Sequence, residues 1–86
     1  MKSILVVDDE QNIRFLYKEE LEDDGYSVSF ASSGEEALKT LADNIPDLAI
    51  LDIKMSGMDG IETMRKIKDE KDDIPVILCS AHGKYK

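Results

Sequence analysis

The stretch Leu48–Gly60, LAILDIKMSGMDG, decides the fold. Its apolar residues 48–51 lead directly to a single carboxylate, Asp52, and a loop with two glycines follows. An apolar run that ends at one acid and a turn is typical of a buried strand that carries a functional group at its C-terminal end. The rest of the chain either repeats this pattern or is expected to pack against it.

Two more apolar runs end in polar side chains. Ile4–Val7 runs into the adjacent acids Asp8 and Asp9, and Pro75–Cys79 runs into Ser80. Short, continuously apolar runs of this kind are typical of strands that are buried on both faces of a parallel sheet. We therefore expect three such strands, each with polar groups at its C-terminal end.

The segments between these strands complete an alternating order. Ser27–Ala31 alternates polar and apolar residues, which predicts a strand at or near a sheet edge. Helices are predicted over Gln11–Asp24, after Ser33 in a capping box, and after Asp59. Apolar side chains at helical spacing are expected to face the sheet, namely Ile13, Leu16, Tyr17 and Leu21 in the first helix and Ile61, Met64 and Ile67 in the third.

This alternation predicts an α/β fold with a doubly wound parallel sheet and helices on both faces. The chain has 86 residues, enough for one domain. Its formal net charge of −8 argues against nucleic-acid binding by this segment. No apolar run is long enough to span a bilayer, and Cys79 as a single cysteine excludes an internal disulfide. We expect a cytoplasmic location and no membrane partner.

The polar groups at the strand ends define the candidate site. If the three apolar strands are neighbours, Asp8, Asp9, Asp52 and Ser80 meet at one edge of the sheet. Carboxylates this close repel each other unless a cation offsets their charge. Because the ligands are hard oxygens without a histidine or thiolate, the pattern favours Mg²⁺ or Mn²⁺ over zinc.

Asp52 is the natural nucleophile of this set because it stands alone at its strand end. A carboxylate beside a bound divalent cation can attack phosphorus and form an aspartyl phosphate. Any one acid after a strand is more simply a helix cap or a solvated loop residue. The combination of an acid pair, a single acid and a hydroxyl at three strand ends favours the phosphoacceptor interpretation.

The chain resembles the receiver domain of two-component response regulators. The motifs that carry the resemblance are ILVVDDE at Ile4–Glu10, DLAILDIKMSGMDG at Asp47–Gly60 and IPVILCSA at Ile74–Ala81. The resemblance covers essentially all of residues 1–86. It implies a flavodoxin-like sheet with strand order 2-1-3-4.

The resemblance also implies a role for each site residue. Asp9 is expected to bind Mg²⁺ directly, Asp8 largely through water, and the backbone carbonyl of Lys54 is expected to supply another ligand. Asp52 itself is expected to bind the metal as well. A sensor histidine kinase or a phosphotransfer protein is the expected partner.

Two residues after the fourth strand are implied to contact the phosphoryl group on Asp52. Ser80 matches the switch hydroxyl that carries the signal outward, and the backbone N–H of Ala81 is a second contact. The expected function is signal transduction and not enzymatic catalysis, with at most weak autophosphatase activity in complete family members.

The sequence differs from a complete receiver at its C-terminal end. A complete receiver continues with a helix, a strand and a final helix, and the fifth strand ends in a lysine that pairs with the phosphoryl group. We therefore expect residues 1–86 to be a domain that is incomplete at the C-terminus, impaired in phosphorylation and prone to self-association through the exposed fourth strand or by element swapping.

Other function classes fit the sequence less well. An aspartyl-nucleophile phosphatase needs a second acid two residues after the nucleophile, where this chain has Lys54. A flavin-binding electron carrier needs a phosphate loop after the first strand, where acids stand instead. A non-phosphorylatable interaction module or domain-swapped module remains the alternative.

Overall fold

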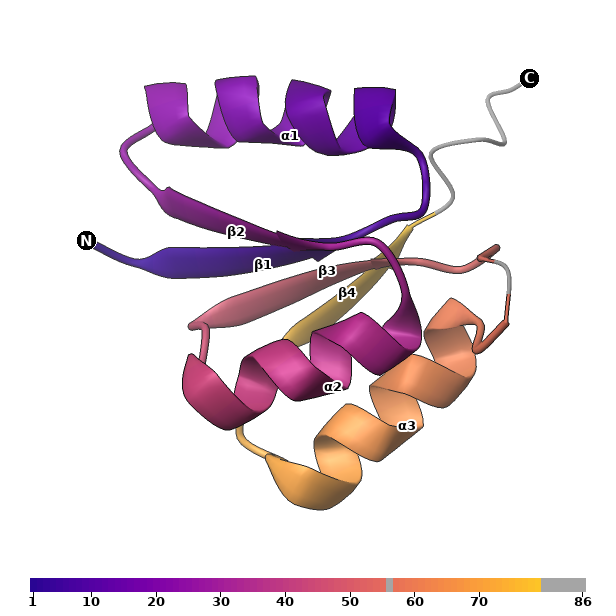
Figure 1. The fold of residues 1–86 in the computed structure, drawn as a ribbon. Coiled ribbons are helices and arrows are strands. Elements are labelled where there is room, and N and C mark those ends of the chain that lie inside the picture. Colours follow the sequence, from indigo (N-terminus) through magenta and orange to yellow (C-terminus); the bar gives the residue numbers. More distant parts are fainter. Residues whose placement is uncertain (56, 80–86) are drawn as a thin grey trace.

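Strands and helices alternate along the whole described part of the chain (Figure 1). The computed structural model describes residues 1–55 and 57–79. The elements are β1 Ser3–Val7, α1 Gln11–Asp23, β2 Ser27–Ala31, α2 Gly34–Asp43, β3 Leu48–Asp52, α3 Gly60–Glu70 and β4 Val76–Cys79. The predicted order of elements is therefore confirmed.

The strands form one parallel sheet in the order β2-β1-β3-β4. Helix α1 covers one face, and α2 and α3 lie side by side on the other (Figure 1). This confirms the doubly wound fold and the predicted strand order. The chain runs outward from β1 to β2 and then returns to place β3 on the other side of β1. The point where the order reverses thus lies between β1 and β3, which is where such sheets bind ligands.

Burial along the strands follows their position in the sheet. The central strands β1 and β3 are buried at every residue except their first, whereas β2 alternates between exposed and partly buried residues until Ala31. Strand β4 is only partly buried, and Ile77 within it is 49% exposed. Among the described residues, β2 and β4 are the two edges of the sheet.

The larger part of the core lies between the sheet and helices α2 and α3. Leu5, Leu51, Leu41 and Ile67 meet there and are almost inaccessible to solvent. A smaller cluster around Ile4, Val6 and Ile50 lies on the α1 side, partly covered by Tyr17, Leu21 and Cys79. None of the helices in residues 1–55 and 57–79 combines the length and the apolar character needed to cross a membrane.

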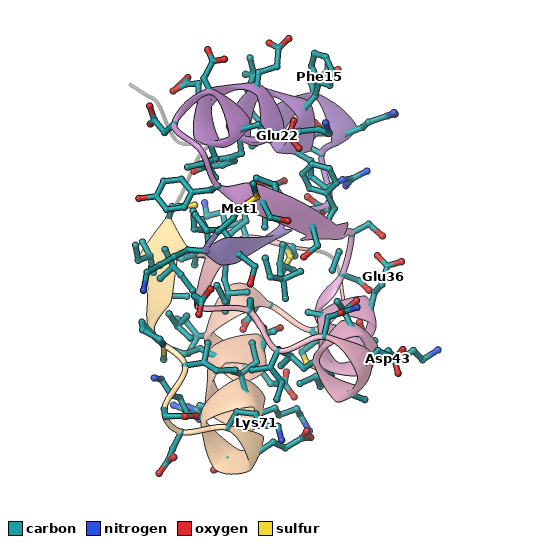
Figure 2. The ribbon with its side chains drawn as sticks, turned by 90° about the vertical axis from the view of Figure 1, so that its left-hand side faces the viewer. Met1, Phe15, Glu22, Glu36, Asp43 and Lys71 are labelled. Carbon is teal, nitrogen blue, oxygen red and sulfur yellow. The ribbon has the colours of Figure 1, made fainter. Side chains whose placement is uncertain are left out.

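Two predicted helix faces are wrong in part. Leu16 was expected to face the sheet but is 53% exposed, and α1 has no buried residue. Phe15 points away from the sheet at the outer surface of α1 (Figure 2). In α3, Ile61 is 42% exposed, while Thr63 is fully buried. Thr63 tolerates burial because its hydroxyl donates to the carbonyl oxygen of Asp59 at 2.8 Å.

The helix caps follow the sequence closely. The Ser33 hydroxyl oxygen accepts the Glu36 amide at 3.1 Å, and the Asp59 carboxylate accepts the Glu62 amide at 2.8 Å. The Glu36 side chain bonds the amide and hydroxyl of Ser32, one residue before the cap position that the capping box predicts. These bonds, the amide first, lower the pKa of Glu36. Each cap fixes the start of a helix that follows the carboxyl end of a strand, β2 for Ser33 and β3 for Asp59.

Candidate functional site

Three carboxylates gather at the carboxyl edge of the sheet. One oxygen each of Asp8, Asp9 and Asp52 lies within 4.8 Å of the others. Asp8 directly follows β1 and Asp52 is the last residue of β3. The structure therefore brings together the three acids that the strand ends predicted to meet, at the point where the strand order reverses.

The two adjacent acids differ in environment. Asp8 is 1% exposed, as is Asp52, whereas Asp9 is exposed. The cluster therefore combines two buried acids with one exposed acid. The sequence alone treats Asp8 and Asp9 as a pair, and only the direction of the chain after β1 distinguishes them.

Asp8 is held from three sides. Its amide donates to the carbonyl oxygen of Ala31 in β2 at 3.1 Å, and its Oδ1 accepts the Glu10 amide at 2.9 Å. The Arg14 guanidinium donates to the Asp8 carbonyl oxygen at 2.6 Å. Sequence analysis did not assign a role to Arg14, because its position on the polar side of α1 gives no sign of a contact with the preceding loop.

Asp52 is held by its neighbours on β3 and β4. It pairs in register with Cys79, and the next amide, that of Ile53, donates to the Cys79 carbonyl oxygen at 2.8 Å. The Lys54 amide lies 3.3 Å from Asp52 Oδ1. The amide of residue 54 therefore lies beside the carboxylate, and the role of the Lys54 carbonyl oxygen as a metal ligand stays a prediction.

Gly60 is a further site residue that sequence analysis missed. The amide of Gly60 donates to the Ile53 carbonyl oxygen at 3.0 Å, so the first residue of α3 lies directly on the backbone that follows Asp52. A Cβ atom at this position would lie 2.2 Å from the Asp52 carbonyl oxygen. Only glycine permits this approach. The sequence signal was a glycine directly after the helix cap Asp59.

The donor set fits a hard divalent cation. Carboxylates within 4.8 Å of each other repel, and their burial at Asp8 and Asp52 strengthens that repulsion. A bound Mg²⁺ offsets this charge, because it prefers carboxylate and carbonyl oxygens and usually keeps several waters.

Two of the predicted site residues, Ser80 and Ala81, lie outside the described residues. The described chain ends at Cys79, directly beside Asp52 in the sheet. Met55, three residues after Asp52, is buried in the core.

Comparison with known proteins identifies the family. The family model of the response regulator receiver domain matches residues 4–86. The chain belongs to this family.

Individual relatives and solved structures agree with the family match. The response regulator MprA of Mycobacterium sp. (strain KMS) is 41% identical over 78 residues, which are 91% of this chain and 34% of MprA. The response regulator TrrA of Thermotoga maritima, solved in complex with Mg²⁺-BeF, is 50% identical with a TM-score of 0.91, over 100% of this chain and 75% of that one. TrrA in complex with the histidine kinase ThkA gives a TM-score of 0.89, over 100% of this chain and 74% of that one.

The similar proteins are longer than this sequence. The chain spans about a third of the length of the MprA proteins that it matches, at 34% of each. It spans 66% of the sporulation initiation phosphotransferase F of Bacillus subtilis, to which it is 40% identical over 82 residues, or 95% of this chain. The region shared with these relatives is the receiver domain. This similarity does not assign the functions of the whole relatives to this chain.

Proposed function

We propose that this chain is a phosphoacceptor that takes a phosphoryl group from a histidine kinase onto Asp52. The observation that carries the proposal is the meeting of Asp8, Asp9 and Asp52 within 4.8 Å at the switch point of the sheet. The transfer forms a bond between a carboxylate oxygen of Asp52 and phosphorus. It breaks the bond from phosphorus to the kinase's histidine nitrogen, which leaves with the electron pair.

The proposed metal ligands divide according to their burial. Asp9, on the exposed side, binds Mg²⁺ directly, and the buried Asp8 binds it largely through water, while Asp52 and the carbonyl oxygen of Lys54 complete the protein ligands. Bound Mg²⁺ supplies positive charge to the phosphoryl oxygens. Asp8 maintains its position through its bonds with Ala31, Glu10 and Arg14, so the site is largely preformed.

The proposed partner is a sensor histidine kinase or a phosphotransfer protein. The similarity to TrrA, which was solved with the histidine kinase ThkA and with Mg²⁺-BeF, supports this partner and this metal. Ser80 and Ala81 are proposed to contact the phosphoryl group on the strength of the sequence motif. A cytoplasmic location also stays a prediction.

The 86-residue polypeptide taken alone is proposed to be a weak phosphoacceptor. In the family, a lysine at the end of a fifth strand pairs with the phosphoryl group, and the residues that the structure describes form four strands. Loss of one positive charge at a developing anion costs several kcal/mol in comparable sites. Mg²⁺ binding by this polypeptide does not depend on that lysine.

Self-association is the second proposed property, and the exposure of β4 favours it. Within the described residues, β4 is an edge of the sheet, and Ile77 is 49% exposed. An apolar edge strand is a template for pairing with a second copy. Association through β4 is also the form that a non-phosphorylatable interaction module would take.

Titration with Mg²⁺, followed by acetyl phosphate or beryllofluoride, tests the phosphoacceptor proposal. The wild-type chain is expected to bind Mg²⁺ in calorimetry, and Asp52→Asn is expected to weaken this binding by at least about tenfold because it removes one anionic ligand. Asp43→Asn, at an exposed acid at the end of α2, is the matched control and is expected to bind like wild type.

Two outcomes would count against these statements. A wild-type chain that binds no Mg²⁺ contradicts the metal site and with it the phosphoacceptor proposal. Stoichiometric modification of Asp52 in the 86-residue polypeptide contradicts the proposed weakness of phosphorylation, while it supports Asp52 as the acceptor.

A further inference from the structure

A side-chain contact joins α1 to the carboxyl end of β4. The Tyr17 hydroxyl lies 3.4 Å from the Cys79 sulfur, across 62 positions of sequence, and either group can donate the hydrogen bond. Both side chains are partly buried beside the small core cluster of β1 and β3 residues. The contact therefore connects a helix on one face of the sheet with the last residue of an edge strand.

Cys79 is also the residue that supports Asp52 within the sheet. Strand β1 pairs with β3 only as far as Val7 opposite Leu51, one residue before Asp52. Strand β4 continues to Cys79 opposite Asp52, and the Cys79 carbonyl oxygen accepts the Ile53 amide at 2.8 Å. The strand pairing at Asp52 thus comes from Cys79 and not from β1.

The Tyr17 hydroxyl is in the protonated form that the hydrogen bond with Cys79 requires. Burial, the contact with Cys79 and the negative charges of Asp8 and Asp52 all raise the pKa of the Tyr17 hydroxyl. The phenol is therefore neutral throughout the physiological range and retains its proton for a hydrogen bond. The sulfur of Cys79 can accept or donate in return.

We propose that Tyr17 is a positioning residue for the phosphoacceptor site. Its hydroxyl holds the end of β4 against α1 through Cys79, and Cys79 in turn fixes the backbone at Asp52 and Ile53. The functional part of this inference rests on the proposed role of Asp52. Tyr17 itself does not touch the reacting atoms.

Amide hydrogen exchange in Tyr17→Phe tests whether the Tyr17 hydroxyl holds the carboxyl end of β4 in place. The variant keeps the ring and removes only the hydroxyl. At the carboxyl end of the β3–β4 pair, the Ile53 amide bonds the Cys79 carbonyl, and at the amino end the Ala49 amide bonds the Pro75 carbonyl at 3.0 Å. Exchange at Ile53 is expected to rise about threefold, as for loss of one neutral hydrogen bond, while exchange at Ala49 stays at the wild-type rate.

A double-mutant cycle tests whether the effect passes through Cys79. Calorimetric titration is expected to show Mg²⁺ binding weakened about threefold in Tyr17→Phe. The same substitution in a Cys79→Ala background is expected to weaken binding no further. Tyr26→Phe is the matched control, because it removes a hydroxyl from a tyrosine that directly precedes β2, at the amino end of the strands, and it is expected to bind Mg²⁺ like wild type.

The possible results separate the positioning role from a general stabilising one. Equal increases in exchange at Ile53 and Ala49, or no increase at either, overturn the proposal. Additive effects of the two substitutions on Mg²⁺ binding overturn the route through Cys79. If the wild-type chain binds no Mg²⁺, the proposed function fails, and the exchange comparison still decides whether Tyr17 holds the strand end.

Discussion

Gly60 and Asp52 are in such close contact that a side chain on the glycine is excluded. An added Cβ atom would lie 2.2 Å from the Asp52 carbonyl oxygen and 2.8 Å from its carbonyl carbon. Backbone atoms cannot move aside as the end of a flexible side chain can. The start of α3 therefore fixes the same stretch of main chain that carries the proposed acceptor.

Gly60→Ala is expected to destabilise the chain by about 1–3 kcal/mol and to weaken Mg²⁺ binding, because the helix must shift away from Asp52. Gly25→Ala is a suitable control. Gly25 has a φ of +94° with nothing within 4 Å of an added Cβ atom, so alanine there introduces only backbone strain. It is expected to cost about 1 kcal/mol without a change in Mg²⁺ affinity. Urea denaturation and calorimetry measure the two effects, and equal metal affinity in both variants would contradict this account.

Asp8→Asn is expected to stabilise the chain in the presence of EDTA. The substitution removes one of three negative charges within 4.8 Å, and the asparagine oxygen can still accept the Glu10 amide. Relief of the repulsion is expected to add about 1 kcal/mol to the free energy of unfolding. The same variant should lose most of the stabilisation that Mg²⁺ gives to wild type. Asp43→Asn serves as the exposed-acid control, and a destabilised Asp8→Asn chain in EDTA would argue against charge repulsion.

Alkaline pH is expected to destabilise the chain through Tyr17. Its pKa is raised above the ordinary value of 10.0, first by burial and then by the contact with Cys79. Below pH 10 the phenol is protonated in both the folded and the unfolded chain, so the raised pKa of Tyr17 makes its full contribution to the free energy of unfolding. Above pH 10 the unfolded chain loses this proton while the folded chain keeps it, and the free energy of unfolding falls. Denaturation at about pH 9 and about pH 11 measures the fall in the free energy of unfolding between these two pH values. This fall should be smaller in Tyr17→Phe than in wild type.

Ile77→Lys is expected to shift the 86-residue chain towards the monomer. Ile77 is the exposed residue of β4, and a lysine on an edge strand opposes pairing with a second copy. Ile61→Lys places the same charge on an exposed residue of α3 and should leave association unchanged. Sedimentation at several concentrations measures the effect. A wild-type chain that is monomeric and melts cooperatively at high concentration would contradict self-association.

The sequence predicts the sheet well because its signals are local. The apolar runs before Asp8 and Asp52 predict their own burial, and parallel strands place their carboxyl ends at one edge without further information. The caps Ser33 and Asp59 depend on residues only three positions away. For these features, neighbours in sequence determine the structure.

Features that depend on tertiary contacts were harder to predict. The apolar pattern identifies the correct side of α1, but Leu16 is 53% exposed because the pattern does not tell how much of that side the sheet covers. Thr63 is buried because α2 approaches α3 at Gly34, where an added Cβ atom would lie 2.2 Å from the Thr63 hydroxyl oxygen. A count of apolar residues cannot detect a small polar residue at such a crossing.

Every described residue of the proposed site lies at the carboxyl edge of a parallel sheet, and this leaves the opposite edge available for engineering. The turn between α1 and β2 at Gly25 lies at the amino end of β2, at the far end of the strands from Asp8 and Asp52. Its open surroundings make it a place for a fluorescent label or a short inserted peptide. A label at Gly25 would mark the chain without touching the acidic cluster.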